Sequence, residues 1–455
     1  MPTAYTILFL LLILVAAATW IIPAGSYDYV DGVPVAGTYH TVEQNPQGVG
    51  DVLKAAFSGF YDAVDVCVFI LMVGGFLSVV MKTGAVDAGV GNVIRLLGGR
   101  EKWLIPILML LFGLGGTTYG MWEETMAFYP LLIPVFLAAG YDAVVGISVI
   151  LLGAGAGVIA STVNPFATGI AAGFAGVSLG EGIVLRLLEW VAFEAAAIWF
   201  VMAYAAKVKK NPSKSVVGVG AGKIQVSMDQ QVPFTAKRKV IMALFTLTFL
   251  IMVYAVVPFD EMGLSLPALG WWFPALSALF LVAGVVIGLI DRMSEEELVE
   301  TYVAGCADLL GVAFIIGISR GITVLMNDGA ITDTVLHWGE QALSGAGAIS
   351  FTLLVFALYL PLSILIPSSS GLATLSIPIV APLGKFAGVG GDLVVTAFQS
   401  ASGLVNIITP TAAVVMGALA LGHVPYDRWV KYVWKLILWF LLLALAFLVA
   451  GVLLG

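Results

Sequence analysis

Long apolar stretches separated by short polar loops dominate the chain. Nine of them are long enough to cross a bilayer as helices, since a span needs about 20 apolar residues. They cover residues 4–23, 64–82, 142–175, 184–206, 240–258, 269–290, 308–326, 392–423 and 429–454. The pattern predicts an all-α polytopic membrane protein, because helices satisfy their own backbone hydrogen bonds in lipid.

Two further apolar stretches are interrupted at their centres by polar segments. Residues 103–140 contain GLGGTTYGMWEE, and residues 349–388 contain LIPSSSG. Irregular backbone at membrane depth must lie in protein or line a wet cavity, so each stretch predicts a re-entrant hairpin with a buried polar tip. Two spans are also predicted to break, 142–175 before Pro165 and 392–423 before Pro410, because proline removes a helical hydrogen bond.

The chain repeats part of its own sequence. Residues 69–86 align without a gap to residues 314–331, with six identities in 18 positions. The spacing of two prolines and a glycine in 130–140 recurs in 378–388. Duplicated apolar segments interrupted by Gly and Pro are typical of secondary transporters that bind their substrate between two repeats.

The repeat divides the chain into five parts. Each repeat is expected to begin with an amphipathic helix at the membrane surface, over 50–62 and 292–305. The parts are a first span with an external loop (1–49), a first repeat (50–207), a linker (208–239), two connecting spans (240–291) and a second repeat (292–455).

Charge supports this organisation and orients it. Only 11% of the residues are charged, 60% are hydrophobic and the mean hydropathy is +1.05, which excludes an ordinary soluble domain. Most lysines and arginines lie in 82–102, 207–239 and 428–435, and cytoplasmic loops retain basic residues. This distribution predicts a protein of a bacterial-type inner membrane with its N-terminus on the cytoplasmic side. The two repeats then have inverted topology, with 103–140 opening from the cytoplasm and 349–388 from outside.

No sequence motif indicates a cofactor. The chain has no phosphate-binding loop, zinc-ligand spacing, catalytic triad or nucleic-acid patch, which argues against ATP-driven transport within this chain. Cys67 and Cys306 lie within or beside apolar runs, as small packing residues do. A coupling Na⁺ or H⁺ is the only bound ion that the sequence suggests, and the expected partners are a small substrate and the bilayer.

The first hairpin tip carries Thr117, Trp122, Glu123 and Glu124. Two adjacent carboxylates near the membrane midplane cost several kcal/mol unless they meet a cation, a proton or water. They therefore indicate a binding site. The alternative is that one of them pairs with a structural base such as Arg320 or stays protonated between the hairpin arms.

The second tip supplies Ser368, Ser369 and Ser370 at the beginning of a half-helix. Backbone N–H groups at such an end attract a carboxylate. The alternative is that these hydroxyls bond to the preceding turn.

The helix breaks bring further candidates. Freed carbonyls and polar side chains at a proline break can bind Na⁺ or a substrate ammonium, whereas a bare kink would bind neither. Arg320, in the middle of a span, either contacts a substrate carboxylate or locks one helix to its neighbour. The candidates at the breaks are Ser161, Thr162, Asn164, Ser402, Asn406 and Thr409.

Four motifs carry a family resemblance: GMWEETMAFYPLLIPV, NPF, GISRGI and LVNIITPTAAVVMGALA. With them the chain resembles the YfcC branch of the DcuC-like C4-dicarboxylate carrier family, within the ion transporter superfamily. The resemblance covers nearly the whole chain. It implies secondary active transport by a homodimer, with a scaffold flanking a moving domain in an elevator-type mechanism.

The resemblance leaves the substrate open, because relatives are assigned to basic amino acids or to dicarboxylates. The tips here differ from the Ser-Asn-Thr tips of dicarboxylate carriers, and Glu123 and Glu124 would repel a dianion. A basic amino acid such as arginine, ornithine or lysine is the favoured substrate, moved by Na⁺ or H⁺ coupling or by exchange. A C4-dicarboxylate carrier is the alternative. Outside this class, a cation channel is the main competitor, and an enzyme is the least favoured.

Overall fold

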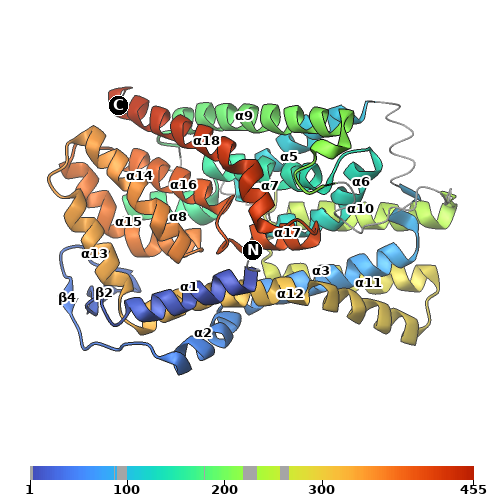
Figure 1. Ribbon diagram of the computed structural model, residues 1–455, viewed down its shortest axis with the longest axis horizontal. Helices are drawn as coiled ribbons and strands as arrows, with labels where there is room; N and C mark the ends of the chain where they lie inside the picture. The colour runs from blue at the N-terminus through green and yellow to red at the C-terminus, as the bar shows by residue number, and fades with distance from the viewer. Residues whose placement is uncertain are drawn as a thin grey trace.

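The computed structural model describes residues 4–86, 88–89, 100–178, 180–218, 233–256 and 266–454. Most of them are helical, and six of the described helices are long and apolar enough to cross a membrane. The predicted linker 208–239 lies partly outside the described residues. Figure 1 shows the helices in two layers that face each other along the length of the molecule.

The first layer, at the bottom of Figure 1, is built on the contact of α12 with α2 and α3. Small residues let these backbones approach closely. A Cβ at Gly59 of α2 would overlap the backbone of Gly317 and Gly321 in α12, and Gly74 of α3 lies against Gly305 in the same way. The layer consists of α1 (Ala4–Ala18), α2 (Val49–Asp62), α3 (Val64–Lys82), α10 (Ala236–Val256), α11 (Phe273–Asp291) and α12 (Glu295–Asp328).

The second layer holds both interrupted hairpins and both broken spans. Its outer side is formed by α9 and α18, which run side by side in Figure 1. Its elements are η1 (Glu101–Trp103), α5 (Leu104–Tyr119), η2 (Glu123–Phe128), α6 (Tyr129–Ala138), α7 (Ala143–Ile159), η3 (Pro165–Gly169), α8 (Ile170–Ala175), α9 (Ile183–Lys210), η4 (Pro212–Lys214), α13 (Thr332–Leu343), α14 (Ala348–Leu365), α15 (Ser369–Phe386), α16 (Gly391–Asn406), α17 (Ala413–Leu421) and α18 (Tyr426–Leu454).

Both apolar stretches with polar centres fold as two helices around an interruption. In the first, α5 ends at Tyr119, and the next residue, Gly120, has a left-handed φ of 76°. Glycine takes this conformation without the steric cost that a side chain brings. A 3₁₀ turn then leads into α6. In the second, α14 ends at Leu365, and Ser368 caps α15 by accepting the N–H of Gly371 at 3.2 Å.

The two broken spans are also present. The first is interrupted between α7 and the π-helical turn η3, and the second between α16 and α17. The first tip begins later than predicted. Because α5 continues through Tyr119, Thr117 and Thr118 lie in the last turn of this helix and not in the tip.

A surface helix was expected before the first span of each repeat. It is a separate helix only in the first repeat. There α2 ends at Asp62, and the chain changes direction at Ala63 before α3. In the second, residues 295–305 are the first turns of α12, which runs unbroken for 34 residues. Its sequence contains no proline that would end it.

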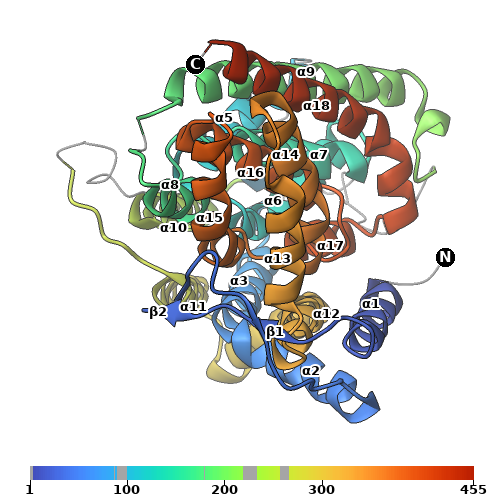
Figure 2. The same ribbon diagram turned by 90° about the vertical axis from the view of Figure 1, so that its left-hand side faces the viewer.

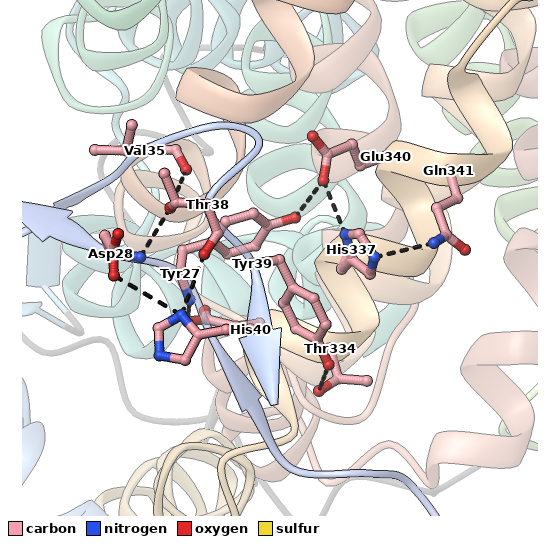
Figure 3. Close-up of polar contacts among 11 residues, drawn as sticks. Tyr27, Asp28, Val35, Thr38, Tyr39, His40, Thr334, His337, Glu340 and Gln341 are labelled. Carbon is pink, nitrogen blue, oxygen red and sulfur yellow. Dashed lines mark hydrogen bonds and ion pairs between the residues drawn. The ribbon is translucent and has the colours of Figure 1, made fainter. Parts of the chain in front are cut away.

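A loop between α1 and α2 folds onto α13. Its strands pair as β1 (Gly25–Ser26) with β4 (His40–Thr41) and β2 (Tyr29–Val30) with β3 (Val33–Pro34). Figure 3 shows the ring of Tyr39 stacked on His337, with centroids 4.0 Å apart, while the Tyr27 hydroxyl donates to Glu340 at 2.8 Å. Figure 2 shows α13 beside α14 and α15, so this loop is fixed to the layer that carries the second hairpin.

Candidate functional site

A cavity of about 220 Å³ lies between the two layers. It brings together residues from both hairpin tips, both helix breaks and the first layer. The second layer contributes Gly120, Trp122, Glu123, Glu124, Asn164, Ser368, Ser369, Ser370 and Asn406, and the first layer contributes Asp62, Asp65, Trp272, Ser319 and Arg320.

The first tip holds its carboxylates by a local hydrogen bond. Glu124 is 6% exposed, and its Oε2 accepts the backbone N–H of Trp122 at 3.1 Å. The hydroxyl of Thr125 donates to the carbonyl of Trp122. Because Glu123 precedes Glu124 in the same 3₁₀ turn, this bond fixes the position of both acids on the cavity wall.

The first tip closes directly on the break of the first broken span. A Cβ at Gly120 would lie 2.6 Å from the amide of Asn164, so the absence of a side chain lets the two segments meet. The Asn164 Oδ1 accepts the N–H of Ala167 at 3.3 Å. The tip and the break therefore form one continuous wall.

The second tip presents the beginning of α15 to the cavity. Ser368, Ser369 and Ser370 line it, and only the N–H of Gly371 in this turn is capped by a serine hydroxyl, at 3.2 Å. The N-terminus of a helix carries a partial positive charge and N–H groups without intrahelical partners. This part of the wall is suited to a carboxylate.

The opposite wall contains two acids that sequence reasoning did not assign to the site. Asp62 lies 3.1 Å from the guanidinium Nε of Arg320, and Asp65 accepts the indole N–H of Trp272 at 3.2 Å. Arg320 therefore forms its ion pair with Asp62, and its charge also acts on Glu123 of the tip. The sequence feature that could have indicated these acids is the pair itself, since Asp62 and Asp65 stand three residues apart where an apolar span begins.

Five of the predicted site residues do not line the cavity. Thr117 donates to the carbonyl of Ala160 at 2.8 Å, and Thr162 donates to the carbonyl of Thr117 at 3.0 Å. Their hydroxyls join the end of α5 to the first break instead of facing the cavity. Ser161 accepts from Thr168 at 2.8 Å, Thr409 shares a 2.9 Å bond with Thr411, and Ser402 is buried within α16.

The charge of the cavity is predominantly negative. Four carboxyl groups line it, against one guanidinium. The beginning of α15 lines the same cavity. The site therefore has an acidic region, formed by the carboxyl groups, and a region at α15 that attracts anions. This arrangement matches a ligand that carries both a cationic group and a carboxylate.

The sequence comparisons agree with the membrane-protein pattern. The family model described as C4-dicarboxylate anaerobic carrier matches residues 1–453. A Haemophilus influenzae protein is 35% identical over 503 residues, which cover 99% of this chain and 97% of that protein. An Escherichia coli protein with the name "Putative basic amino acid antiporter YfcC" is 30% identical over 480 residues, which cover 95% of this chain and 92% of that protein. Among solved structures, the YdaH transporter of Alcanivorax borkumensis matches with 15% identity, a TM-score of 0.44 and 98% of each chain covered.

Proposed function

Because the chain belongs to the C4-dicarboxylate anaerobic carrier family, we propose that it is a secondary transporter of basic amino acids such as arginine, ornithine and lysine. The family resemblance predicted from its motifs is confirmed by this match and by the YfcC relative. A carrier with several membrane-crossing helices is a multi-pass membrane protein. The observation that supports the substrate class is the cavity, which places four acids near the beginning of α15.

Each end of a basic amino acid has a matching part of the cavity wall. Glu123, Glu124 and Asp65 receive the side-chain ammonium or guanidinium, because buried carboxylates need a counter-charge. The N-terminus of α15 with its serines receives the carboxylate. Asn164 and Asn406 supply amide groups to the same cavity.

Transport requires that the cavity open alternately to the two sides of the membrane. The tips and breaks belong to one layer, while Asp62, Asp65 and Arg320 belong to the other. Sliding of the second layer along the first, an elevator-type movement, would carry the substrate across. The proposed arrangement has inverted repeats, a cytoplasmic N-terminus, an inner-membrane location and a homodimer whose first layers form the scaffold.

Coupling to Na⁺, coupling to H⁺ and exchange of one amino acid for another all fit this site. A coupling Na⁺ would bind at the two breaks. There Asn164 and Asn406 lie near the freed carbonyls, with the hydroxyls of Ser161, Thr162 and Ser402 close in sequence. The hydroxyl of Thr117 reaches the first break through its bond to the carbonyl of Ala160. Replacing either asparagine with alanine would then change the sodium dependence of uptake more than it changes expression.

A C4-dicarboxylate is the second candidate substrate. Arg320 and the beginning of α15 both line the cavity, and each attracts a carboxylate. In this case Glu123 and Glu124 would hold coupling cations, since alone they repel a dianion.

Counterflow in proteoliposomes separates the two substrates. Vesicles loaded with unlabelled arginine should take up labelled arginine, and excess lysine or ornithine should compete. Thermal stabilisation of the purified protein by these amino acids provides a binding measurement, because a ligand of the folded state raises its stability. Uptake and stabilisation by succinate, with none by the basic amino acids, would contradict the proposal.

A further inference from the structure

Glu194 stands deep within α9, away from the cavity. It lies eleven residues after Ile183 and sixteen before Lys210, which is about 16 Å and 24 Å from the two ends at 1.5 Å per residue. The residue is 2% exposed, and neither side-chain oxygen has a hydrogen-bond partner among the described residues. A buried carboxyl group without a hydrogen-bond partner is costly and calls for an explanation in function.

The first hairpin is built around this carboxyl group. A Cβ at Gly113 of α5 would lie 2.8 Å from Cδ of Glu194, so glycine leaves the room that the carboxyl occupies. On the other side of Gly113, its carbonyl lies against Gly157 of α7. The neighbouring Phe193 packs edge-on against Phe440 of α18, with ring centroids 4.7 Å apart. The carboxyl therefore sits at the contact of α9 with α5, on a helix that also packs against α7 and α18.

The charged and titratable groups around α9 are engaged elsewhere. Glu189 accepts from Ser400 of α16 at 2.8 Å, and Arg186 donates to the carbonyl of Glu181 at 2.7 Å. Within the described helices, α7 contributes no titratable residue, and in α5 the only one is Tyr119, at its far end. The remaining groups on the packed elements are Asp392 near Arg186, Tyr432 beside Tyr204, Lys435 with Trp434, Tyr426, Asp427, Arg428 and Lys431 at the start of α18, and Lys214 in η4.

We propose that Glu194 is a proton-binding site whose protonation is coupled to movement of the first hairpin. A carboxylate without water or a counter-charge is strongly disfavoured, so the packed arrangement of α5 on α9 requires the neutral acid. Loss of the proton to water would require α5 to separate from α9. The proton passes from the carboxyl oxygen to a water molecule and returns by the same route, with no other bond changed.

The coupling to the cavity runs along α5. One turn after Gly113 stands Thr117, which is bonded to Ala160 and Thr162 at the first break. Three residues further, Gly120 begins the tip that carries Glu123 and Glu124. Displacement of α5 at Gly113 therefore moves the tip and the break together. This coupling role rests on the proposed transport function, whereas proton binding does not.

Infrared spectroscopy tests the proton site without any substrate. The purified parent protein should show carboxylic-acid carbonyl absorption near neutral pH, and Glu194→Gln should remove one component of it, the Glu194 band. Glu189→Gln is the matched control, since Glu189 is buried on the same helix but bonded to Ser400, and it should leave the Glu194 band in place. Gly113→Ala should shift the band, because the added methyl group displaces the carboxyl. An unchanged band in the Glu194→Gln protein would overturn the proposal.

Transport measurements test the coupling. With Glu194→Gln, uptake driven by a pH gradient should fall at least tenfold, while exchange of labelled for unlabelled arginine continues. Gradient-driven uptake equal to that of the parent would overturn the coupling. If the parent exchanges no basic amino acid but the band behaves as expected, the proposed substrate is wrong and the proton site stands.

Discussion

The guanidinium Nε of Arg320 lies 3.1 Å from the Asp62 carboxylate on the cavity wall. Their side chains are 30% and 52% exposed, so the pair adds little to stability, about 0–1 kcal/mol. Its main effect is on the charge of the cavity. Pairing with Asp62 neutralises the only cationic side chain among the described residues that line it.

Asp62→Asn should therefore weaken binding of arginine and leave the fold intact. The change frees the positive charge of Arg320 within the cavity, and the expected loss is about three- to tenfold, or ~1 kcal/mol for a partly exposed charge. Titration calorimetry measures it. The double variant Asp62→Asn with Arg320→Gln should recover most of the affinity. If Asp62→Asn binds arginine more tightly, the proposed charge preference is wrong.

Glu123→Gln and Glu124→Gln test the acidic tip. Removing a charge that is buried against a cationic ligand costs roughly 2–5 kcal/mol, so one variant should bind arginine at least tenfold more weakly. Both keep the shape of the side chain, and in Glu124→Gln the amide oxygen can still accept the N–H of Trp122. Glu296→Gln, at an exposed position in the first turn of α12, is the control. Arginine affinity equal to that of the parent in both tip variants would favour the dicarboxylate substrate.

Gly120→Ala tests the contact of the first tip with the first break. The substitution costs about 1–2 kcal/mol for a left-handed residue, and its methyl group would also displace Asn164. Gly140→Ala is a matched control, since Gly140 has φ 84° but no atom within 4 Å of an added Cβ. Both variants should lose thermal stability, and only Gly120→Ala should lose uptake. Equal uptake by the two variants would mean that the tip tolerates displacement of Asn164.

The elements of the site were predictable because their signals are local. Polar residues, Gly and Pro inside apolar runs mark tips and breaks wherever the chain folds in a membrane, and these segments meet in the cavity. The roles of Asp62 and Asp65 were not predictable in this way. Gly59 packs between Gly317 and Gly321, and this contact of α2 with α12 helps to position Asp62 beside Arg320.

The sequence also does not show which side of a fully buried helix faces the cavity. Ser402 and Thr409 lie in segments that are buried on nearly all sides, so no hydrophobic face indicates which way a hydroxyl points. The same limitation applies to Glu194. Its position within α9 follows from the sequence, but its neighbour Gly113 is 81 residues away in the chain and is brought close only by the packing of α5 on α9.

The last prediction concerns the orientation of the chain in the membrane. In a protein with Cys67 and Cys306 replaced, a cysteine at Ser213 should react with a membrane-impermeant maleimide only in inside-out vesicles, because basic loops remain cytoplasmic. A cysteine at Asp31 should react only in intact cells with a permeable outer membrane. Both positions are exposed, so lack of reaction reports the side of the membrane and not burial. Labelling of both positions from the same side would contradict the proposed inverted repeats, because α2 and α3 would then enter the membrane from the wrong face.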